Sequence, residues 1–497
     1  MFKINPLLCT DGYKTSHHLM YPEGTELVFS NFTPRSTKYM PPEAQDIVVF
    51  GVQYTIKYIN DLFQENFFNQ SKELVCNQLQ EHLNSYLGFN YNIKHFESLY
   101  DLGYLPVEIR SLEEGSVIQS KIPILTIHNT LPEFYWLTNF LETLISTTLW
   151  KPMHSASMSY AYHKIVRKYA LETDKDNLLG LDFQCHDFSM RGMQSLESAI
   201  SSALGFLVSS RGSDTLAVLQ AAKYYYYEPS SAFSVPASEH AVMTAYGKEN
   251  EIESFRRILE LYPTGIVSMV SDQYDLWKVL SEILPKLKKL ILNRDGKAVF
   301  RPDSGDPVDI LCGNYKGSNY QRLEHRDKWK PQEKGVIELL WDIFGGTVNE
   351  QGYKVLNPKV GCIYGDSITL ERADKICKRL KQKGFASTNI VFGVGSYSLG
   401  FCTRDSQGSA IKAVYCEING EGREIFKDPI TDDGTKKSAK GLLSVILDEN
   451  GSYILKDQCT WEDVFSEKNQ LKLRFRDGKL MNETCLSDIR NKLWNTE

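Results

Sequence analysis

The stretch Cys185-His-Asp-Phe-Ser-Met-Arg-Gly192 lies where a predicted strand passes into a predicted helix. A run containing apolar residues, 179–183, precedes it, and a helix-like segment begins at Gln194. Phe188 offers an aromatic face that can stack on a flat ring, and Arg191 offers a fixed fork of donors that suits a phosphate. In the alternative interpretation, Phe188 packs in the core and Arg191 pairs with a surface carboxylate. The rest of the chain decides between them.

The same pattern recurs from about residue 150 onward. Short apolar runs alternate with helix-length segments, and each run ends in polar residues or glycine. This alternation is typical of a (β/α) barrel, whose active site is formed by the loops after the strands. An open doubly wound sheet is the competing layout. Polar ends after every run, rather than at one switch point, favour the barrel. The predicted strands are 181–185, 266–270, 298–300, 360–363 and 390–392.

The two ends of the chain have a different pattern. Residues 53–68 predict a helix, and short alternating or β-branched runs predict strands at 106–110, 122–127, 410–418 and 442–447. We therefore expect an α+β domain at 1–150, to which 405–497 returns, and a barrel-like domain at 151–404. The predicted fold class is α/β, with an irregular (β/α) barrel-like domain and an α+β domain formed from both chain ends.

Composition narrows the function. The 497 residues suffice for two domains or one large barrel, and 42% hydrophobic with 24% charged residues is ordinary for a soluble globular protein. A net charge of -6 gives no basic field for nucleic acid, and no segment reads as a membrane span. Ten cysteines without a Cys-x-x-Cys pair, and no secretory signal, predict a cytoplasmic protein. No P-loop and no His-Glu-x-x-His motif is present, which argues against P-loop nucleotidases and transition-metal hydrolases.

Residues with chemistry suited to a phosphorylated sugar follow the predicted strands. Arginines suit phosphate, aspartates suit hydroxyls or Mg²⁺, and glycines let a backbone with free N–H groups approach a ligand. Each is a weak signal alone, but together at one barrel mouth they would form a binding pocket. The residues are Arg191, Arg301, Asp272, Asp303, Asp366, Gly365, Gly393 and Gly395.

Two residues have both a structural and a functional interpretation. His240 begins a predicted helix after a turn at Pro236, so with Asp272 on its other nitrogen it can be a base or a nucleophile. Alternatively, it is a packed structural histidine. Asp214 is either the N-cap of a helix or, beside Phe188, the acceptor for a ligand N–H.

Several motifs, in the same order, resemble the nicotinamide phosphoribosyltransferase family. The resemblance runs from Asn5-Pro6 to Phe426-Lys-Asp-Pro429 and so covers most of the chain. The chain departs from the family's pattern at Ser396 and at Gly12, where Gly and Ser are common. The motifs are His186-Asp-Phe-Ser-Met-Arg-Gly192, Gly212-Ser-Asp-Thr215, Ser234-Val-Pro-Ala-Ser-Glu-His240, Val270-Ser-Asp272, Arg301-Pro-Asp-Ser-Gly305, Tyr364-Gly-Asp366 and Phe392-Gly-Val-Gly395.

The resemblance implies a pentosyltransferase. Such an enzyme joins nicotinamide to 5-phosphoribosyl-1-pyrophosphate and releases nicotinamide mononucleotide and pyrophosphate, a reaction of NAD salvage. It also implies Mg²⁺ as cofactor, ATP as co-substrate and a homodimer with shared active sites. ATP hydrolysis through a phosphorylated His240 would shift the balance toward product, with Asp272 orienting the ring and Lys436 contacting ATP.

The resemblance further implies roles for individual residues. The pyridine ring would stack between Phe188 and Tyr13 of the partner subunit, while Asp214 would accept from the carboxamide and repel the carboxylate of nicotinate. Arg301 and Asp303 would fix the amide and ribose, and Asp303 with pyrophosphate is a possible Mg²⁺ site. The ribose and phosphate ligands would be Arg191, Ser234, Ser268, Gly365, Asp366, Gly395, Ser396 and Arg404, and the pyrophosphate side would be lined by Asp11, Arg35, Lys412 and Lys427.

Three alternatives remain open. Nicotinate phosphoribosyltransferase shares the barrel, but an acid at Asp214 would disfavour a carboxylate substrate. A non-catalytic binding protein on the same fold would not need the complete set of polar residues. An FMN-dependent barrel oxidoreductase would also bind a sugar phosphate, and the purified protein would then absorb as a flavin.

Overall fold

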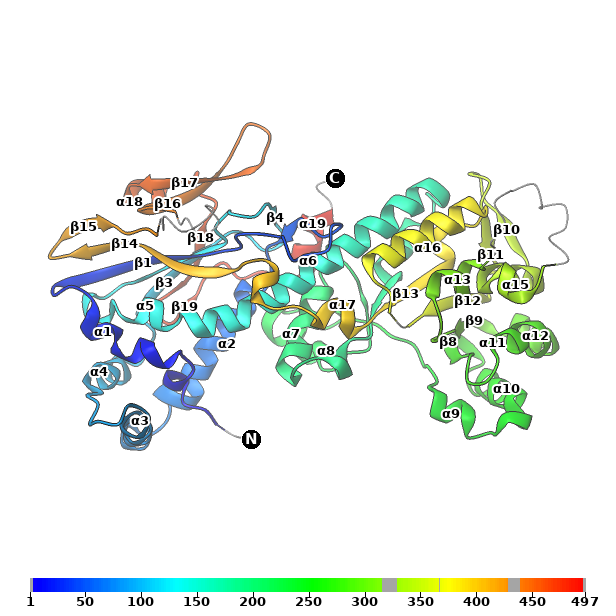
Figure 1. Cartoon of the computed structure of the whole chain (residues 1–497), viewed down its shortest axis with the longest axis horizontal. Helices are drawn as coiled ribbons and strands as arrows, with labels where there is room; N and C mark the ends of the chain where they lie inside the picture. Colours follow the sequence, from blue (N-terminus) through cyan, green and yellow to red (C-terminus); the bar gives the residue numbers. More distant parts are fainter. Residues whose placement is uncertain (1–2, 315–328, 366, 428–438, 495–497) are drawn as a thin grey trace. The chain divides into compact units, whose positions relative to one another are not determined.

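The computed structural model describes residues 3–314, 329–365, 367–427 and 439–494. The chain forms two compact units (Figure 1). The first contains residues 1–157, 220–229 and 402–497, and the second contains residues 158–219 and 230–401. Helices α6 (Glu142–Thr173) and α8 (Val218–Tyr226) have residues in both. The predicted domains, 1–150 with 405–497 and 151–404, stay a prediction. The sequence alone did not indicate that residues 220–229 belong to the first unit.

The first unit is formed from both chain ends around an antiparallel sheet. Its seven strands lie in the order β15-β14-β1-β5-β3-β18-β19, so that the N-terminal strand β1 lies between the C-terminal strand β14 and β5. Phe29 of β1 is opposite Tyr415 on one side and His128 on the other. The strands of this unit are β1 (Thr25–Thr33), β2 (Ile47–Val48), β3 (Val107–Ser111), β4 (Val117–Ile118), β5 (Leu125–Asn129), β14 (Ala410–Ile418), β15 (Glu421–Glu424), β16 (Leu442–Leu447), β17 (Tyr453–Cys459), β18 (Lys472–Arg476) and β19 (Lys479–Leu480).

Helices of the first unit pack apolar side chains into the same core as the sheet. Phe63 of α2, Phe96 of α4 and Phe32 of β1 are buried in one cluster. The predicted helix 53–68 is present as α2 followed by one π-helical turn, Gln64–Phe68. The helices are α1 (His17–Met20), α2 (Val52–Phe63), α3 (Lys72–Leu87), α4 (Lys94–Leu102), α5 (Leu137–Phe140), α18 (Trp461–Phe465) and α19 (Leu486–Trp494).

The second unit contains a parallel sheet. Its six strands lie in the order β7-β6-β13-β12-β9-β8, and every pairing in it is parallel. Because the strands run the same way, their carboxyl ends meet at one edge. The strands are β6 (Cys185–Asp187), β7 (Gly212–Ser213), β8 (Thr264–Val270), β9 (Asp295–Arg301), β12 (Val360–Tyr364) and β13 (Ile390–Val394), and the small hairpin β10 (Gly346–Val348) with β11 (Lys354–Leu356) lies apart from them.

An extended segment joins the two edge strands of this sheet. Phe233 forms a parallel bridge with Gly212 of β7, and Ala237 forms another with Ser268 of β8. The sheet is thus an irregular barrel, in which isolated bridges to this segment connect the edge strands β7 and β8. The predicted fold class is confirmed. An open doubly wound sheet would have left these two edges apart.

Helices follow most strands of the second unit. In Figure 1, α13, α15 and α16 lie beside β9 and β12, as the barrel pattern predicts. The helices are α7 (Leu196–Phe206), α9 (His240–Thr244), α10 (Glu251–Leu261), α11 (Leu276–Lys278), α12 (Leu284–Asn293), α13 (Pro307–Cys312), α14 (Pro331–Lys334), α15 (Val336–Phe344), α16 (Leu370–Gln382) and α17 (Ser396–Gly400).

Two predicted strands are wrong in their limits. The strand expected at 122–127 is β5, which begins at Leu125 and ends at Asn129. The expected strand 181–185 begins only at Cys185, because Leu178–Phe183 forms a 3-10 turn. Gly180 and Asp182 have low β propensity, and Leu179 is 95% exposed, so this run does not supply the buried face of a strand. Within the described residues, no helix combines the length and apolar character needed to span a membrane.

Candidate active site

A cavity of about 800 Å³ opens at the carboxyl ends of the parallel strands. All of its lining residues belong to the second unit. They follow β6, β7, β9, β12 and β13 or lie at the start of α9. Tertiary structure therefore brings together predicted residues that are up to 208 positions apart in sequence (from 188 to 396). Those that line the cavity are Phe188, Arg191, Asp214, His240, Arg301, Asp303, Gly365, Gly395 and Ser396.

The ring of Phe188 lies against glycine backbones. A Cβ on Gly393 would come within 2.5 Å of the ring, and a Cβ on Gly365 would come within 3.2 Å of it. The Phe188 N–H donates to Val394 O at 2.9 Å, which ties the loop after β6 to β13. The two glycines therefore make room for an aromatic face in the cavity, a use that Gly-x-Gly alone did not indicate.

Asp214 has one carboxylate oxygen already engaged. Its Oδ1 accepts from Ser234 Oγ at 2.5 Å and from His186 Nε2 at 3.0 Å. Among the described residues, no hydrogen bond reaches its Oδ2. Partial burial works to raise the pKa of this carboxyl, but the hydrogen bonds from His186 and Ser234 and the charge of Arg301 lower it below its usual value. Asp214 is therefore an anionic acceptor on the cavity wall.

Asp187 organises the loops that carry Phe188 and Asp214. It is fully buried, and its Oδ1 accepts from the N–H and the hydroxyl of Ser189. Its Oδ2 accepts from Ser213 Oγ at 3.0 Å and from Thr215 Oγ1 at 2.7 Å. The sequence alone suggested no role for Asp187 or for its neighbour His186. The signal was available in the pairing of an His-Asp-x-Ser run with a Ser-x-Thr run, both rich in short hydroxyl donors.

Asp272 connects His240 to the loop after β9. Its Oδ1 lies 3.3 Å from His240 Nε2, and its Oδ2 accepts from the Asp303 N–H at 3.0 Å and from the Ser304 hydroxyl. The Asp272 side chain is 4% exposed, whereas that of His240 is 49% exposed. The arrangement fixes the imidazole while leaving its outer edge open to the cavity.

Arg301 reaches into the cavity from the end of β9. Its Nη2 donates to Ser238 O at 3.0 Å, and its buried Nε has no hydrogen-bond partner among the described residues. Because a buried donor without a partner is unfavourable, Nε is poised for an acceptor on a ligand. Arg191, in the turn Met190–Gly192, supplies a second cation, and Gly192 leaves room for the Ser396 hydroxyl.

Among the described residues, three predicted ligands of the ribose phosphate are not part of this lining: Ser234, Ser268 and Arg404. Ser234 donates to Asp214 instead of facing a ligand, and Ser268 has a buried hydroxyl beside the bridge to Ala237. Their predicted roles in binding stay untested. Asp366 lies outside the described residues, as does Lys436.

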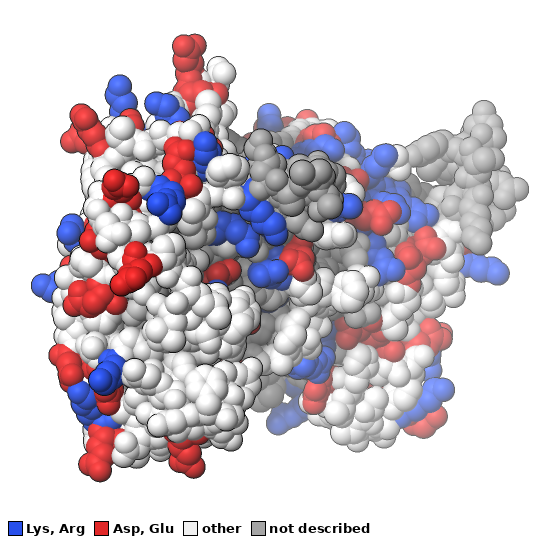
Figure 2. All heavy atoms as spheres, turned by 60° about the vertical axis from the view of Figure 1, so that its left-hand side comes forward, with Lys and Arg blue, Asp and Glu red and all other residues white. Residues whose placement is uncertain are grey.

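The remaining predicted cations lie close to one another in the first unit. Partial desolvation lowers the pKa of Lys412, and the charges of Arg35, Lys427 and Arg404 lower it further, while Glu142 acts in the opposite sense. Arg35 Nε donates to Gly408 O at 2.8 Å. Figure 2 shows a group of Lys and Arg side chains close together on one face. Such a group attracts a polyanion.

Two further predicted residues of the first unit are near the N-terminus. Asp11 accepts from Thr143 Oγ1 at 2.6 Å and does not cap the 3-10 turn that follows it. Tyr13 is 65% exposed, and its ring lies 5.3 Å from that of His17. An exposed tyrosine ring is available for stacking on another surface.

No group of three or more His, Cys, Asp or Glu side chains in the described part of the chain is placed to hold a metal ion. This donor set does not form a cage for a transition metal. It fits Mg²⁺ bound largely through substrate phosphates, since that ion commonly takes only one or two carboxylates from the protein.

Two family models match the chain. The model of the "Nicotinate phosphoribosyltransferase (NAPRTase) family" matches residues 183–479. The model of the "Nicotinamide phosphoribosyltransferase, N-terminal domain" matches residues 5–109. The first match spans the whole cavity, and the second covers the N-terminal part of the first unit.

Two bacterial proteins are similar over 88% or more of this chain. The nicotinamide phosphoribosyltransferase of Acinetobacter baylyi is 45% identical over 99% of this chain and 97% of its own length. That of Mycoplasma pneumoniae is 36% identical over 88% of this chain and 94% of its own. A crystal structure of nicotinate-nucleotide pyrophosphorylase from Pyrococcus furiosus has a TM-score of 0.55 at 15% identity, covering 100% of this chain and 97% of that one, which supports the fold alone.

Proposed function

The chain belongs to the nicotinamide phosphoribosyltransferase family, and on that premise we propose that it transfers 5-phosphoribosyl from phosphoribosyl pyrophosphate to nicotinamide. The products are nicotinamide mononucleotide and pyrophosphate, and the reaction serves NAD salvage. The ten cysteines all lie in the described residues and none of them forms a disulfide, which supports a cytoplasmic location.

The observation that carries the choice of substrate is the position of Asp214 beside Phe188. The pyridine ring stacks on Phe188, and Asp214 Oδ2 accepts a hydrogen bond from the carboxamide NH₂. Nicotinate would bring a second carboxylate against Asp214, which is disfavoured by like-charge repulsion. Nicotinate phosphoribosyltransferase activity is therefore the less favoured alternative.

The reaction is a substitution at the anomeric carbon of the ribose. The lone pair of the pyridine nitrogen forms the new N–C bond as the bond from carbon to the pyrophosphate oxygen breaks, and pyrophosphate leaves with that electron pair. The chain contributes mainly by positioning the two reactants and by stabilising the charge that develops on the leaving group. Arg301 and Asp303 hold the amide and ribose, and Arg191, Gly395 and Ser396 bind the 5′-phosphate.

Asp303 is the protein ligand that best suits Mg²⁺ bound with the pyrophosphate. The ion, when bound, neutralises charge on the leaving pyrophosphate. In the first unit, the group of cations formed by Arg35, Arg404, Lys412 and Lys427 suits a polyanion such as pyrophosphate.

ATP serves as a co-substrate through His240. Because Asp272 contacts Nε2, Nδ1 is the nitrogen left to accept the γ-phosphoryl group as ADP departs. Water then takes the phosphoryl group as phosphate and restores the neutral imidazole. Asp272 holds the ring in place in both states.

We also propose a homodimer in which Tyr13 of the partner subunit covers the pyridine ring opposite Phe188. Tyr13 is strongly exposed and Phe188 lines an open cavity, which supports this pairing. Mixing inactive Tyr13→Ala and Phe188→Ala subunits tests it. Restored activity supports shared sites, since one of the two sites in a mixed dimer would then carry both aromatic residues. A mixture that stays inactive argues against shared sites.

Product formation tests the function directly. Wild-type protein is supplied with phosphoribosyl pyrophosphate, Mg²⁺ and either nicotinamide or nicotinate, with and without ATP, and the products are separated by chromatography. We expect mononucleotide from nicotinamide, increased by ATP. Asp214→Asn should lower the preference for nicotinamide over nicotinate, and His240→Ala should abolish only the increase by ATP.

The outcomes separate the alternatives. A preference of the wild-type enzyme for nicotinate would contradict the role of Asp214. No product from either base would favour a binding protein on the same fold. A full ATP effect in His240→Ala would remove the phosphohistidine from the mechanism.

A further inference from the structure

Residues 220–229 leave the pocket-bearing unit and pack in the first unit. They form most of α8 and the turn after it. The excursion begins six positions after Asp214 and ends five positions before Ser234, and these two residues are hydrogen-bonded to each other. The segment is therefore flanked on both sides by the residues that orient the candidate carboxamide acceptor.

The two arms of the excursion are joined at their base. Phe233 bridges Gly212, and its N–H donates to Arg211 O at 2.8 Å. The Arg211 guanidinium lies 4.8 Å from the centre of the Phe233 ring. One step farther, Ser234 Oγ donates to Asp214 Oδ1 at 2.5 Å. We call residues 211–214 and 233–234 the neck of the excursion.

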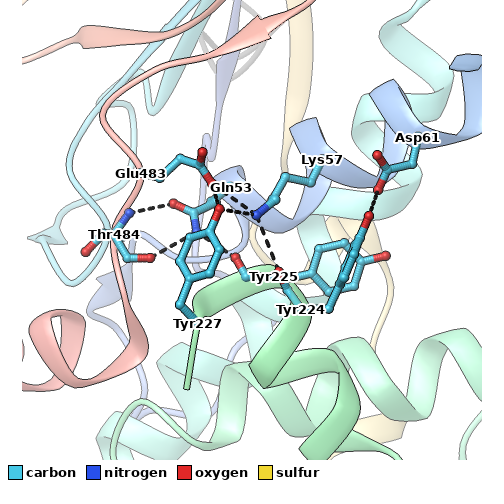
Figure 3. A network of polar contacts seen from close by, with 8 residues as sticks. All are labelled: Gln53, Lys57, Asp61, Tyr224, Tyr225, Tyr227, Glu483 and Thr484. Atoms are coloured by element: carbon cyan, nitrogen blue, oxygen red, sulfur yellow. Dashed lines mark hydrogen bonds and ion pairs between the residues drawn. The ribbon is translucent and has the colours of Figure 1, made fainter. Parts of the chain in front are cut away.

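Lys57 of α2 binds the tip of the excursion, by which we mean residues 224–228 (Figure 3). Its Nζ donates to Tyr227 Oη at 2.6 Å and lies 3.0 Å from Glu483 Oε2, and the Tyr227 hydroxyl also donates to Glu483. The same Nζ is 4.2 Å from the centre of the Tyr227 ring. Tyr224 Oη donates to Asp61 Oδ2 at 2.9 Å on the same helix face. Two tyrosines of the tip are thus held by charged side chains.

Gln53 provides a second attachment. Its amide nitrogen donates to Tyr225 O at 2.6 Å and to Thr484 O at 3.0 Å, and its amide oxygen accepts from the Thr484 N–H at 2.8 Å. Ser487 Oγ donates to Glu228 Oε2 at 2.7 Å. The tip is therefore held between α2 and the segment that enters α19, as Figure 3 shows for Gln53, Tyr225 and Thr484.

The electrostatics support a tight ion pair at the tip. Partial burial opposes the charge on Lys57, yet its hydrogen bonds to Tyr227 and Glu483 raise its pKa. Burial likewise opposes the charge on Glu483, but the hydrogen bonds from Tyr227 and Lys57 lower its pKa. The Lys57 side chain is only 13% exposed, so this pair is less screened by water than a pair on the open surface.

Tyr227 has an unfavourable backbone. Its φ of 56° places a bulky residue in the left-handed region. Such a conformation is unfavourable for a residue other than glycine and persists where its surroundings over-determine it. The contacts of its hydroxyl and ring supply that determination. Strain of this kind is concentrated where a segment must be held in one position.

We propose that this anchor, formed by Gln53, Lys57 and Glu483 around Tyr227, is a positioning device that fixes the neck and thereby the carboxylate of Asp214. The inference rests on the proposed function for its substrate, nicotinamide. The physical link is the chain itself, since both arms run directly from the anchored tip to the neck. With the tip released, the neck samples more conformations, and the acceptor for the carboxamide is less well placed. These residues act through Asp214 and do not touch the reacting atoms.

The test uses three substitutions in the full-length protein, Lys57→Met, Tyr227→Phe and Glu483→Gln. We expect the KM for nicotinamide to rise about tenfold while kcat changes by less than about twofold, because a small displacement of a binding group weakens binding steeply. The preference for nicotinamide over nicotinate should fall by a similar factor. Lys57→Arg, which keeps the charge, should recover part of the loss. Lys72→Met is the matched control, since Lys72 pairs with Asp101 at 2.6 Å on the open surface of the same unit.

Hydrogen exchange followed by mass spectrometry supplies a readout that does not depend on activity. In the three variants, peptides of the neck should exchange about tenfold faster than in wild-type protein, and peptides around the buried helix α7 should not change. Unchanged neck exchange overturns the inference, even if the wild-type enzyme proves inactive. Lower stability with an unchanged KM and unchanged neck exchange also overturns it. A wild-type protein that makes no mononucleotide contradicts the proposed function instead.

Discussion

The parallel sheet of the second unit and the antiparallel sheet of the first collect polar residues by different geometric routes. In the second unit, all six paired strands point the same way, so Phe188, Arg301 and Gly365 reach one cavity although each follows a different strand. In the first unit, β1 and β14 run in opposite directions, so the end of one lies beside the start of the other. Arg35 and Lys412 are neighbours for that reason. A parallel sheet brings together residues that follow its strands. An antiparallel sheet instead places a residue that follows one strand beside a residue near the start of its neighbour.

Polar residues that follow strands carry different information in the two units. A polar residue after a strand is informative in the second unit, because every such position faces the same edge. In the first unit the same signal has no fixed meaning until the pairing is known. Substitutions should therefore show which residues serve the reaction and which only stabilise the fold.

The largest effect should come from Arg301→Met. This change removes a cation from the cavity, and we expect kcat/KM for mononucleotide formation to fall about 1,000-fold, as for loss of a preorganised group that stabilises charge. Thermal unfolding should change little, because the protein loses one hydrogen bond, to Ser238 O, and one charge interaction, with the partly exposed Asp214. Initial rates and unfolding curves measure both. Arg256→Met, at an exposed arginine of α10, is the control, and equal losses in the two variants would contradict a special role for Arg301.

Lys383→Met should have the next largest effect, on stability alone. Lys383 Nζ lies 2.7 Å from Glu338 Oε2, which is 5% exposed, and it also donates to the carbonyl oxygens of Cys312 and Lys334. Removing the cation from a nearly buried carboxylate should lower the free energy of unfolding by about 3 kcal/mol. Urea denaturation measures the loss. Lys72→Met in the first unit should produce no measurable change, and a comparable loss there would mean that burial does not distinguish the two pairs.

Gly393→Ala should weaken nicotinamide binding. The added Cβ would lie 2.5 Å from the Phe188 ring and 2.7 Å from Gly365 Cα, so the ring must move. We expect the KM for nicotinamide to rise about 30-fold, equal to about 2 kcal/mol, a typical effect of overpacking. Gly180→Ala is the control, because its Cβ would meet only Asn177 Oδ1 at 3.5 Å. An unchanged KM in Gly393→Ala would show that the ring does not bind the base.

Acid should lower the stability of the two units by different amounts, and each titrating group should contribute less than the substitutions above. Burial lowers the pKa of His95 and His154 to about 3 and that of His128 to about 4, all in the first unit, and the pKa of His163 in the second to about 4. These rings stay neutral in the fold but bind protons in the unfolded chain below about pH 6.5. Stability is therefore complete above pH 6.5 and falls toward pH 4, by about 1.4 kcal/mol per pH unit for each histidine. Glu114, whose pKa burial raises, opposes this trend.

Proteolysis in increasing urea, with the fragments identified by mass spectrometry, measures each unit separately at pH 7 and pH 5. The first unit should lose more stability than the second between these values. Equal losses would mean that acid sensitivity does not follow the distribution of buried histidines.

Much of the second unit could be predicted from sequence. Apolar runs followed by polar residues located β8, β9, β12 and β13, because buried parallel strands are nearly continuous in their hydrophobicity. The run at 181–185 failed, since the turn before Cys185 contains apolar residues that are not buried. Asp187 was overlooked because a buried aspartate and a surface aspartate look alike until their partners are known.

The sequence by itself determined which chemistry is available in this protein. Its motifs supplied an aromatic face, two arginines, a histidine and several aspartates, and their order along the chain indicated the family. These features are local, since residue type and spacing are written in the chain. Only the tertiary structure decided how they combine: that Ser234 binds Asp214 rather than lining the cavity, that Gly393 accommodates Phe188, and that Tyr227 is held by Lys57 and Glu483. These contacts join positions far apart in sequence, and they form because packing and strand pairing, rather than local spacing, set which side chains meet.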